Sequence, residues 1–132
     1  MKKALLFAAT ILFSLCFLSC KKNKNETVAE KLQHKWLIEN TIENYHDASG
    51  DDITTTPGTS ADFVDFNANG TYTSHSDGYD DNGIYSVVND TQLSIDGDTI
   101  TIKTLTDKKL VLYSKFDYST TDYDEFTINL KR

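Results

Sequence analysis

Two turns of the chain carry side-chain oxygens at spacings that could hold a metal cation. In the first, Asp65, Asn67 and Asn69 alternate before Gly70, as in the first half of an EF-hand calcium loop. The twelfth position of such a loop needs a bidentate glutamate, and here it is Ser76. The same residues also fit a hairpin, because Asn-Gly tolerates a positive φ. We therefore expect a hairpin here, with a weak calcium site as the alternative.

The second oxygen-rich turn lies shortly after the first. Its side chains come from Asp77, Asp80, Asp81 and Asn82. Carboxylate and amide oxygens are what a hard cation prefers, so this turn is a second, weaker calcium alternative. A solvated turn between two strands accounts for the same composition.

The chain lacks the residue spacings of a zinc site or a nucleophilic enzyme. His34, His46 and His75 are scattered, with no pair at the spacing of zinc ligands. The segment 74–77, Ser-His-Ser-Asp, contains the residue types of a hydrolase triad. Adjacent residues of a strand point to opposite faces, so these four cannot form a triad among themselves. We expect no catalytic residues, no cofactor and no enzymatic activity.

An apolar leader precedes the polar part of the chain. Lys2 and Lys3 are followed by an apolar stretch over 4–18, about 22 Å long as a helix and short of the roughly 30 Å of a membrane span. This pattern predicts a secretory signal over 1–19, with an uncut membrane anchor as the alternative. Cys20 directly follows this leader, and with Cys16 removed it would be the last cysteine left, so no internal disulfide could form.

The residues around Cys20 resemble the lipobox of bacterial lipoproteins. The match rests on Phe17-Leu-Ser-Cys20, in which Phe17 stands where that family has a branched aliphatic residue. The resemblance implies a lipid on Cys20 and a lipidated tether over 20–26. It implies a location in the cell envelope, in the outer membrane and facing the periplasm. Because each buried methylene contributes about 0.8 kcal/mol, two or more acyl chains would hold the protein on the bilayer.

The polar part of the chain is acidic. Without Lys2 and Lys3, 11 basic residues stand against 20 acidic ones, a net charge of −9. Nucleic acid is an unsuitable partner, because binding to phosphate needs a basic surface. The length from residue 27 to 132 fits one domain that can bury a core.

The elements that must position these residues are almost all strands. Thr27 and Glu30 have the spacing of a capping box and predict a short helix over 27–34. Trp36, Ile38 and Ile42 alternate with their neighbours at strand period. The polar stretch 44–60 predicts an extended loop. Alternating apolar residues and hairpin turns predict eight strands, over 36–43, 61–67, 70–76, 83–88, 91–96, 99–105, 109–116 and 122–131. The fold class is therefore all-β, an eight-stranded antiparallel up-and-down barrel.

The domain 27–132 resembles the small lipocalin-like lipoproteins common in Bacteroidetes. The resemblance rests on the leader, the short helix, strand spacing and a set of short motifs. These motifs are Lys35-Trp36, Phe66-Asn-Ala-Asn-Gly-Thr-Tyr72, Gly83-Ile-Tyr85, Leu93-Ser-Ile95 and Leu105-Thr-Asp-Lys-Lys-Leu-Val-Leu112. It implies a lipocalin-like barrel that could bind a small apolar ligand or lipid, with Arg132 covering Trp36. The glycine that lipocalins carry two residues before this tryptophan is absent, since His34 occupies that position.

The barrel interior is the expected ligand site. Four aromatic residues on the apolar faces of their strands could line it, namely Trp36, Phe66, Tyr72 and Phe126. The full inward set is bulky, so a filled core is expected, with a small cavity at most. Its members are Trp36, Ile38, Val64, Phe66, Tyr72, Leu93, Ile95, Ile100, Ile102, Leu110, Leu112, Phe126, Ile128 and Leu130. The alternative function is a non-enzymatic envelope interaction that uses the 44–60 loop and the acidic rim against a protein partner.

Overall fold

The computed structural model describes residues 26–132. The chain enters through one helix, α1 (Val28–Leu32), which follows the N-cap Thr27. The Thr27 hydroxyl accepts from the Glu30 amide, and the Glu30 carboxylate accepts from the Thr27 amide, so the capping box is formed. Within residues 26–132, no helix is long and apolar enough to cross a membrane.

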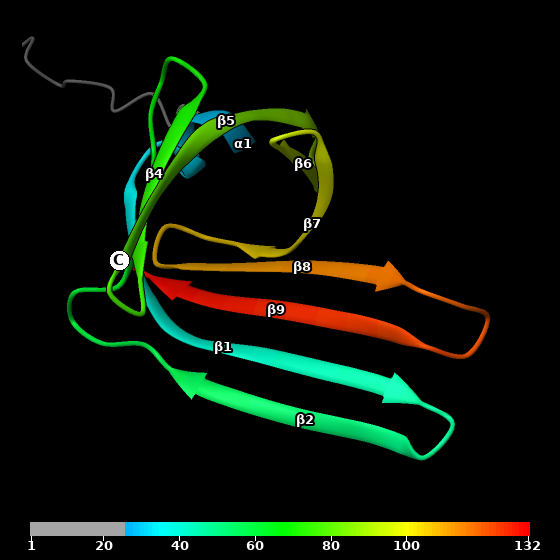
Figure 1. The fold of residues 1–132 in the computed structure, drawn as a ribbon. Helices are drawn as coiled ribbons and strands as arrows, with labels where there is room; N and C mark the ends of the chain where they lie inside the picture. Colours follow the sequence, from blue (N-terminus) through cyan, green and yellow to red (C-terminus); the bar gives the residue numbers. More distant parts are fainter. Residues whose placement is uncertain (1–25) are drawn as a thin grey trace, which may run out of the picture.

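Nine antiparallel strands follow α1 in the described part of the chain (Figure 1). They are β1 (Lys35–Asp47), β2 (Gly50–Pro57), β3 (Phe63–Phe66), β4 (Thr71–Ser76), β5 (Tyr79–Asn89), β6 (Gln92–Ile95), β7 (Asp98–Leu105), β8 (Lys109–Asp117) and β9 (Tyr123–Lys131). Each strand from β3 to β8 pairs with the next one in sequence, and β1 closes the ring by pairing with both β3 and β9. The predicted eight-stranded antiparallel up-and-down barrel with a short N-terminal helix is confirmed.

The expectation of a long loop over 44–60 is wrong. β1 continues to Asp47, turns, and returns as β2, which pairs with β1 from Asn40↔Pro57 to Asp47↔Gly50. All eight residues of β2 are exposed, so the strand has no apolar alternation by which to recognise it. The β-branched run from Ile53 to Thr56 was the signal available, since such residues favour strands.

β2 is an extra strand outside the barrel. The first residues of β1 pair with β3, whereas the later residues pair with β2 on that same edge. The opposite edge of β1 pairs with β9 along most of its length. As a result β8, β9, β1 and β2 run on past the ring as one sheet (Figure 1).

A β-bulge in β1 changes which residues face inward. The register with β9 shifts between Ile38 and Asn40, so that Glu39 is the extra residue. Before the bulge Ile38 lies opposite the buried Leu130, and after it Thr41 lies opposite Ile128. Ile42 therefore faces the other side of the sheet from Trp36 and Ile38. The simple alternation expected for this strand is interrupted at Glu39.

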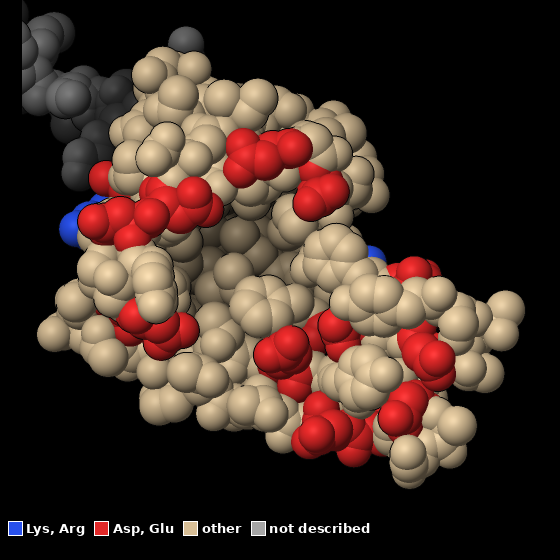
Figure 2. Space-filling view, in the orientation of Figure 1, with Lys and Arg blue, Asp and Glu red and all other residues tan. Residues whose placement is uncertain are grey.

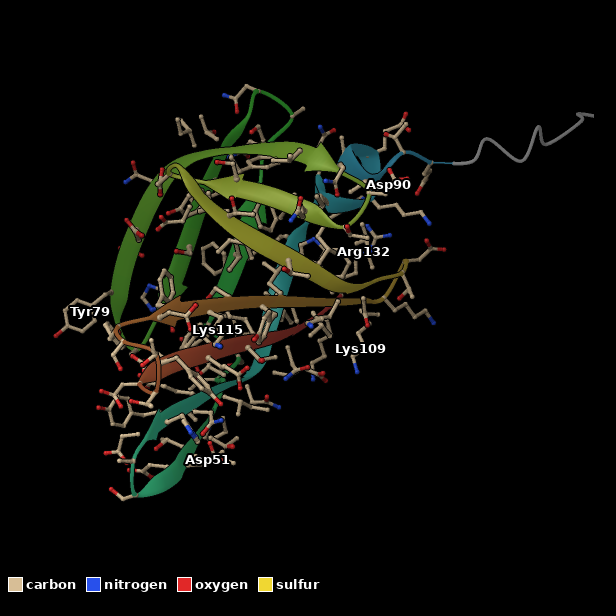
Figure 3. All side chains as sticks on the ribbon, turned by 90° about the vertical axis from the view of Figure 1, so that its right-hand side faces the viewer. Asp51, Tyr79, Asp90, Lys109, Lys115 and Arg132 are labelled. Atoms are coloured by element: carbon tan, nitrogen blue, oxygen red, sulfur yellow. The ribbon has the colours of Figure 1, made fainter. Side chains whose placement is uncertain are left out.

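The core fills the end of the barrel at which α1 lies. Its buried residues are Leu32, Trp36, Ile38, Phe66, Tyr72, Tyr85, Leu93, Ile102, Leu110, Leu112 and Leu130. Four further members of the predicted inward set pack against this core, namely Val64, Ile95, Ile100 and Ile128. The remaining member, Phe126, lines the hollow described below. Arg132 lies with α1 at this end, whereas Tyr79 lies at the opposite end (Figure 3). We call these the closed end and the mouth.

Candidate functional site

Trp36 belongs to the closed end. Its ring is fully buried, and Nε1 donates a hydrogen bond of 3.0 Å to the carbonyl of Leu32. The guanidinium carbon of Arg132 lies 5.2 Å from the centroid of the Trp36 ring, which confirms the predicted cover. Arg132 Nε also donates to the carbonyl of Asp107. Trp36 therefore joins the helix to the barrel and is not among the residues that line the hollow described below.

Phe66 and Tyr72 are core residues. The Phe66 ring packs edge-on against Tyr85 at 4.9 Å and lies tilted 6.5 Å from Tyr72. Both side chains are at least nine-tenths buried. Of the four aromatic residues predicted to line a ligand site, Phe126 is the one that borders the hollow.

An apolar hollow of about 80 Å³ lies between β6, β7, β8 and β9. The end of the barrel that contains it is hollowed in Figure 2. Its walls are Ile95, Ile100, Leu112, Tyr113, Ser114, Phe126 and Ile128. Ser114 lies directly opposite Phe126, where the neighbouring pair on β8 and β9 is Leu112 and Ile128. The small side chain of Ser114 therefore leaves space that a branched residue would fill.

A hydrogen-bonded corner stiffens the rim of the barrel. The Tyr72 hydroxyl donates to Asp96 Oδ2 at 2.7 Å and to Asp81 Oδ2 at 3.3 Å. The Ile84 amide donates to Asp96 Oδ1 at 2.9 Å. These bonds hold the pKa of Asp96 below its usual range, mainly through the Ile84 amide and then through Tyr72. Asp96 itself occupies the β6–β7 turn with φ of +51° and is followed by Gly97, and Asp-Gly is a dipeptide that favours such two-residue hairpins.

Aromatic and acidic residues alternate on the inner face of the sheet beyond the hollow. Directly opposed residues of neighbouring strands share a face. One row across β8, β9, β1 and β2 is Phe116, Asp124, Tyr45 and Asp52, and the row nearer the hollow is Ser114, Phe126, Glu43 and Thr54. We call these eight residues the mouth face. Figure 2 shows acidic side chains among other residues over this part of the molecule, with Lys and Arg only at its margins.

Tyr118 lies beside the mouth face. Its hydroxyl donates a hydrogen bond of 2.6 Å to Asp124 Oδ2. That hydrogen bond, burial and the acidic groups of Asp124, Tyr45 and Glu43 raise the pKa of Tyr118. Asp124, Tyr45 and Glu43 therefore lie close enough to Tyr118 to act on it electrostatically.

The opposite face of the same strands carries the lysines. Lys115 Nζ lies 3.9 Å above the ring of Tyr123 and 3.1 Å from Asp117 Oδ1, and Lys131 pairs with Glu39 at 3.2 Å. On this face the Tyr113 hydroxyl donates to Glu125, which raises the pKa of Tyr113 to about 12. Lys115 and Lys131 thus lie on the face away from the hollow, each paired with a carboxylate.

The first calcium alternative forms the predicted hairpin. Asp65 lies in β3 opposite Thr73. The side-chain amide of Asn67 donates to the Thr71 hydroxyl. Asn69 Oδ1 accepts from the backbone amide and from the hydroxyl of Thr71. Gly70 takes a φ of +83°. The two asparagines therefore use their side chains within the turn.

The second oxygen-rich segment is a turn only at Asp77, because Asp80, Asp81 and Asn82 lie in β5 and pair with β4. Two of the three histidines each lie against an aspartate. His75 Nδ1 lies 2.8 Å from Asp80 Oδ1, and His46 Nδ1 lies 2.7 Å from Asp51 Oδ1. Asp81 accepts from Tyr72, and Asp77 takes a φ of +51° at the tip of the turn. Within residues 26–132, no group of three or more His, Cys, Asp or Glu side chains is arranged to hold a metal ion.

The predicted lipid-attachment site, Cys20, lies outside the described residues.

Several features of the mouth could not be predicted from the sequence. Ser114 is absent from the inward set expected from the sequence. Its place in the period-2 pattern of β8 was the signal that could have put it inside. The grouping of Glu43 and Tyr45 with Asp124 depends on the β1 bulge, which no local pattern marks.

No protein-family model matches this chain, and no curated protein matches it either. The barrel and the geometry of its mouth are therefore the basis on which function must be argued.

Proposed function

We propose that the protein is a non-enzymatic binding protein whose barrel mouth takes up the apolar part of a small ligand. The observation that carries this proposal is the apolar hollow beside Ser114, bordered by Phe126 and Ile128. Ligand sites in barrels are commonly found at the mouth, lined by apolar side chains with a few polar groups nearby. With a volume of about 80 Å³, the hollow fits a short chain or one ring and excludes a whole lipid.

The proposal includes an anchor at Cys20. The lipobox resemblance supports a lipid at this residue, six positions before the first described one. α1 begins at Val28 at the closed end, so a tether from Cys20 would reach the barrel at the end away from the mouth (Figure 3). The mouth would then be open to ligands arriving from water. Substitution of Cys20→Ala should abolish incorporation of radiolabelled fatty acid, and continued labelling would remove the anchor from the proposal.

A pair of serine variants tests the binding function. Ser114→Leu fills the hollow, whereas Ser86→Leu adds the same bulk at an exposed position of β5. The probe is hexan-1-ol, titrated calorimetrically into the full protein in phosphatidylcholine nanodiscs, with the heat from empty nanodiscs subtracted. We expect binding to the unchanged protein and to Ser86→Leu, and loss of binding in Ser114→Leu. Equal binding by all three proteins would refute a site in the hollow.

A second function is supported by the edge of β2. The strand is fully exposed, and its far edge has no partner strand in the described part of the chain. Unpaired backbone groups of this kind can accept a strand from another protein. The protein would then be an envelope accessory that captures its partner by strand addition along β2.

Two lysine variants separate this second function from the first. Ile53→Lys lies in β2, and Thr59→Lys is an exposed control just beyond it. Photo-crosslinking in envelopes should give a partner band that Ile53→Lys removes and Thr59→Lys keeps. A band that survives Ile53→Lys would rule out pairing along β2, and hexan-1-ol binding should be the same in both variants.

A further inference from the structure

The mouth face has a charge pattern that the apolar hollow alone does not explain. Its three carboxylates are those of Glu43, Asp52 and Asp124. Each lies directly opposite an aromatic residue, in the pairs Glu43↔Phe126, Asp52↔Tyr45 and Asp124↔Phe116. Such a pattern places negative charge and ring faces at the same few positions of the sheet.

The lysines of these strands avoid that face. Lys115 lies opposite Glu125 on the other face, where it contacts Tyr123 and Asp117. None of the eight residues of the mouth face is a lysine or an arginine. An anionic ligand such as a fatty-acid carboxylate would find no counter-charge there and would be repelled by three carboxylates. An organic cation would instead be attracted by these carboxylates and by the negative faces of the aromatic rings.

Asp124 adds a hydrogen-bond acceptor to this pattern. Its Oδ2 accepts from the hydroxyl of Tyr118. Its Oδ1 is enclosed by the protein and has no hydrogen-bond partner among the described residues, so Asp124 would act on a ligand at the mouth face through its charge. Tyr118 is 66% exposed, Tyr45 42% and Phe116 45%, so the aromatic residues around Asp124 are open to such a ligand.

We propose that the natural ligand is an organic cation, an amine with a short apolar tail. The tail occupies the hollow at Ser114 and Phe126, and the ammonium group lies on the mouth face between Asp124, Glu43 and the neighbouring rings. This assignment rests on the proposed function, because it requires the hollow to accept an apolar group. It specifies the class of ligand, which the hollow itself leaves open.

Three probes of equal chain length test the class of ligand. Hexylamine, hexan-1-ol and hexanoate are titrated at neutral pH into the full protein in phosphatidylcholine nanodiscs, with empty nanodiscs as the blank. We expect hexylamine to bind at least about ten-fold more tightly than hexan-1-ol, and hexanoate more weakly than both. If hexan-1-ol or hexanoate binds as tightly as hexylamine, the assignment to a cation is overturned while the proposed function stands. If no probe binds, both fail.

Matched substitutions locate the ammonium group. Asp124→Asn removes one charge from the mouth face, and Asp117→Asn removes one from the other face of the same sheet. We expect Asp124→Asn to weaken hexylamine binding about ten-fold with little change for hexan-1-ol, and Asp117→Asn to change neither. Glu43→Gln, at an exposed position, should act in the same direction as Asp124→Asn and guards against a folding defect at Asp124. Equal losses in Asp117→Asn and Asp124→Asn would mean that net charge alone attracts the amine, and would overturn the site.

Discussion

The hydroxyl of Tyr72 donates a hydrogen bond of 2.7 Å to the carboxylate of Asp96, across 24 positions of sequence. This bond joins β4 to the turn between β6 and β7, two parts of the barrel with β5 between them. The same carboxylate accepts from the Ile84 amide on β5. One side chain in a hairpin turn therefore connects three neighbouring segments of the rim.

Replacement of Tyr72 by phenylalanine tests this connection. The ring stays in the core beside Phe66, and the bond to Asp96 is lost. We expect the free energy of unfolding to fall by about 1 kcal/mol, the usual net value of one such bond. Urea unfolding followed by Trp36 fluorescence measures the change. Tyr79→Phe is the control, because Tyr79 is 79% exposed at the mouth and should give no change.

The stability that Asp96 provides should depend on pH. Its pKa in the folded protein lies below the ordinary value of 3.8, because the carboxylate accepts from the Ile84 amide and from Tyr72. A carboxylate with a lowered folded pKa stabilises the protein above its unfolded pKa, and this contribution is lost as the pH falls through the folded value. We therefore expect Asp96→Asn to be less stable than the unchanged protein at neutral pH.

The same comparison in acid completes this test. Below the folded pKa both proteins carry a neutral side chain at position 96, so the difference in unfolding free energy should shrink as the pH falls below 3.8. Urea unfolding at neutral and acidic pH measures both values. A difference that is unchanged in acid would show that the charge of Asp96 contributes nothing.

We expect a glycine to be required at position 83 for full stability as long as position 96 is an aspartate. A Cβ at Gly83 would collide with the carboxylate oxygens of Asp96, and moving that carboxylate breaks its bonds to Ile84 and Tyr72. We expect Gly83→Ala to reduce the free energy of unfolding by about 1–3 kcal/mol. In an Asp96→Ala background the collision is absent, so Gly83→Ala should cost much less. A double-mutant cycle that shows no coupling would contradict this account.

The predictability of the fold and the mouth can be understood from individual strands. β7 was recognisable because Ile100 and Ile102 alternate with polar residues, which marks a strand that is buried on one face. β2 was not recognisable in this way, because the residues on both of its faces are exposed. Whether this segment forms a loop or a strand depends on its pairing with β1. The turn at Asp96-Gly97 was recognisable because its residues tolerate the positive φ that the hairpin needs.

The mouth was harder to predict because it depends on register between distant strands. Phe116 meets Asp124 through the pairing of β8 with β9, and Asp124 meets Tyr45 through the pairing of β9 with β1. The bulge at Glu39 sets the phase of the second pairing and turns Tyr45 and Glu43 inward. A sequence pattern along one strand carries no information about this alignment.

Leu32 should be essential for closing the barrel opposite the mouth. It is completely buried, and its carbonyl accepts from Trp36 Nε1, so α1 contacts the core through both its side chain and its backbone. Leu32→Ala keeps the backbone bond and leaves a cavity, which should reduce the free energy of unfolding by about 2–5 kcal/mol. Lys31→Ala, on the same helix and less buried, is the control and should change stability little. Urea unfolding gives both values. A loss in Leu32→Ala no larger than in Lys31→Ala would show that the barrel is stable without the helix against its end.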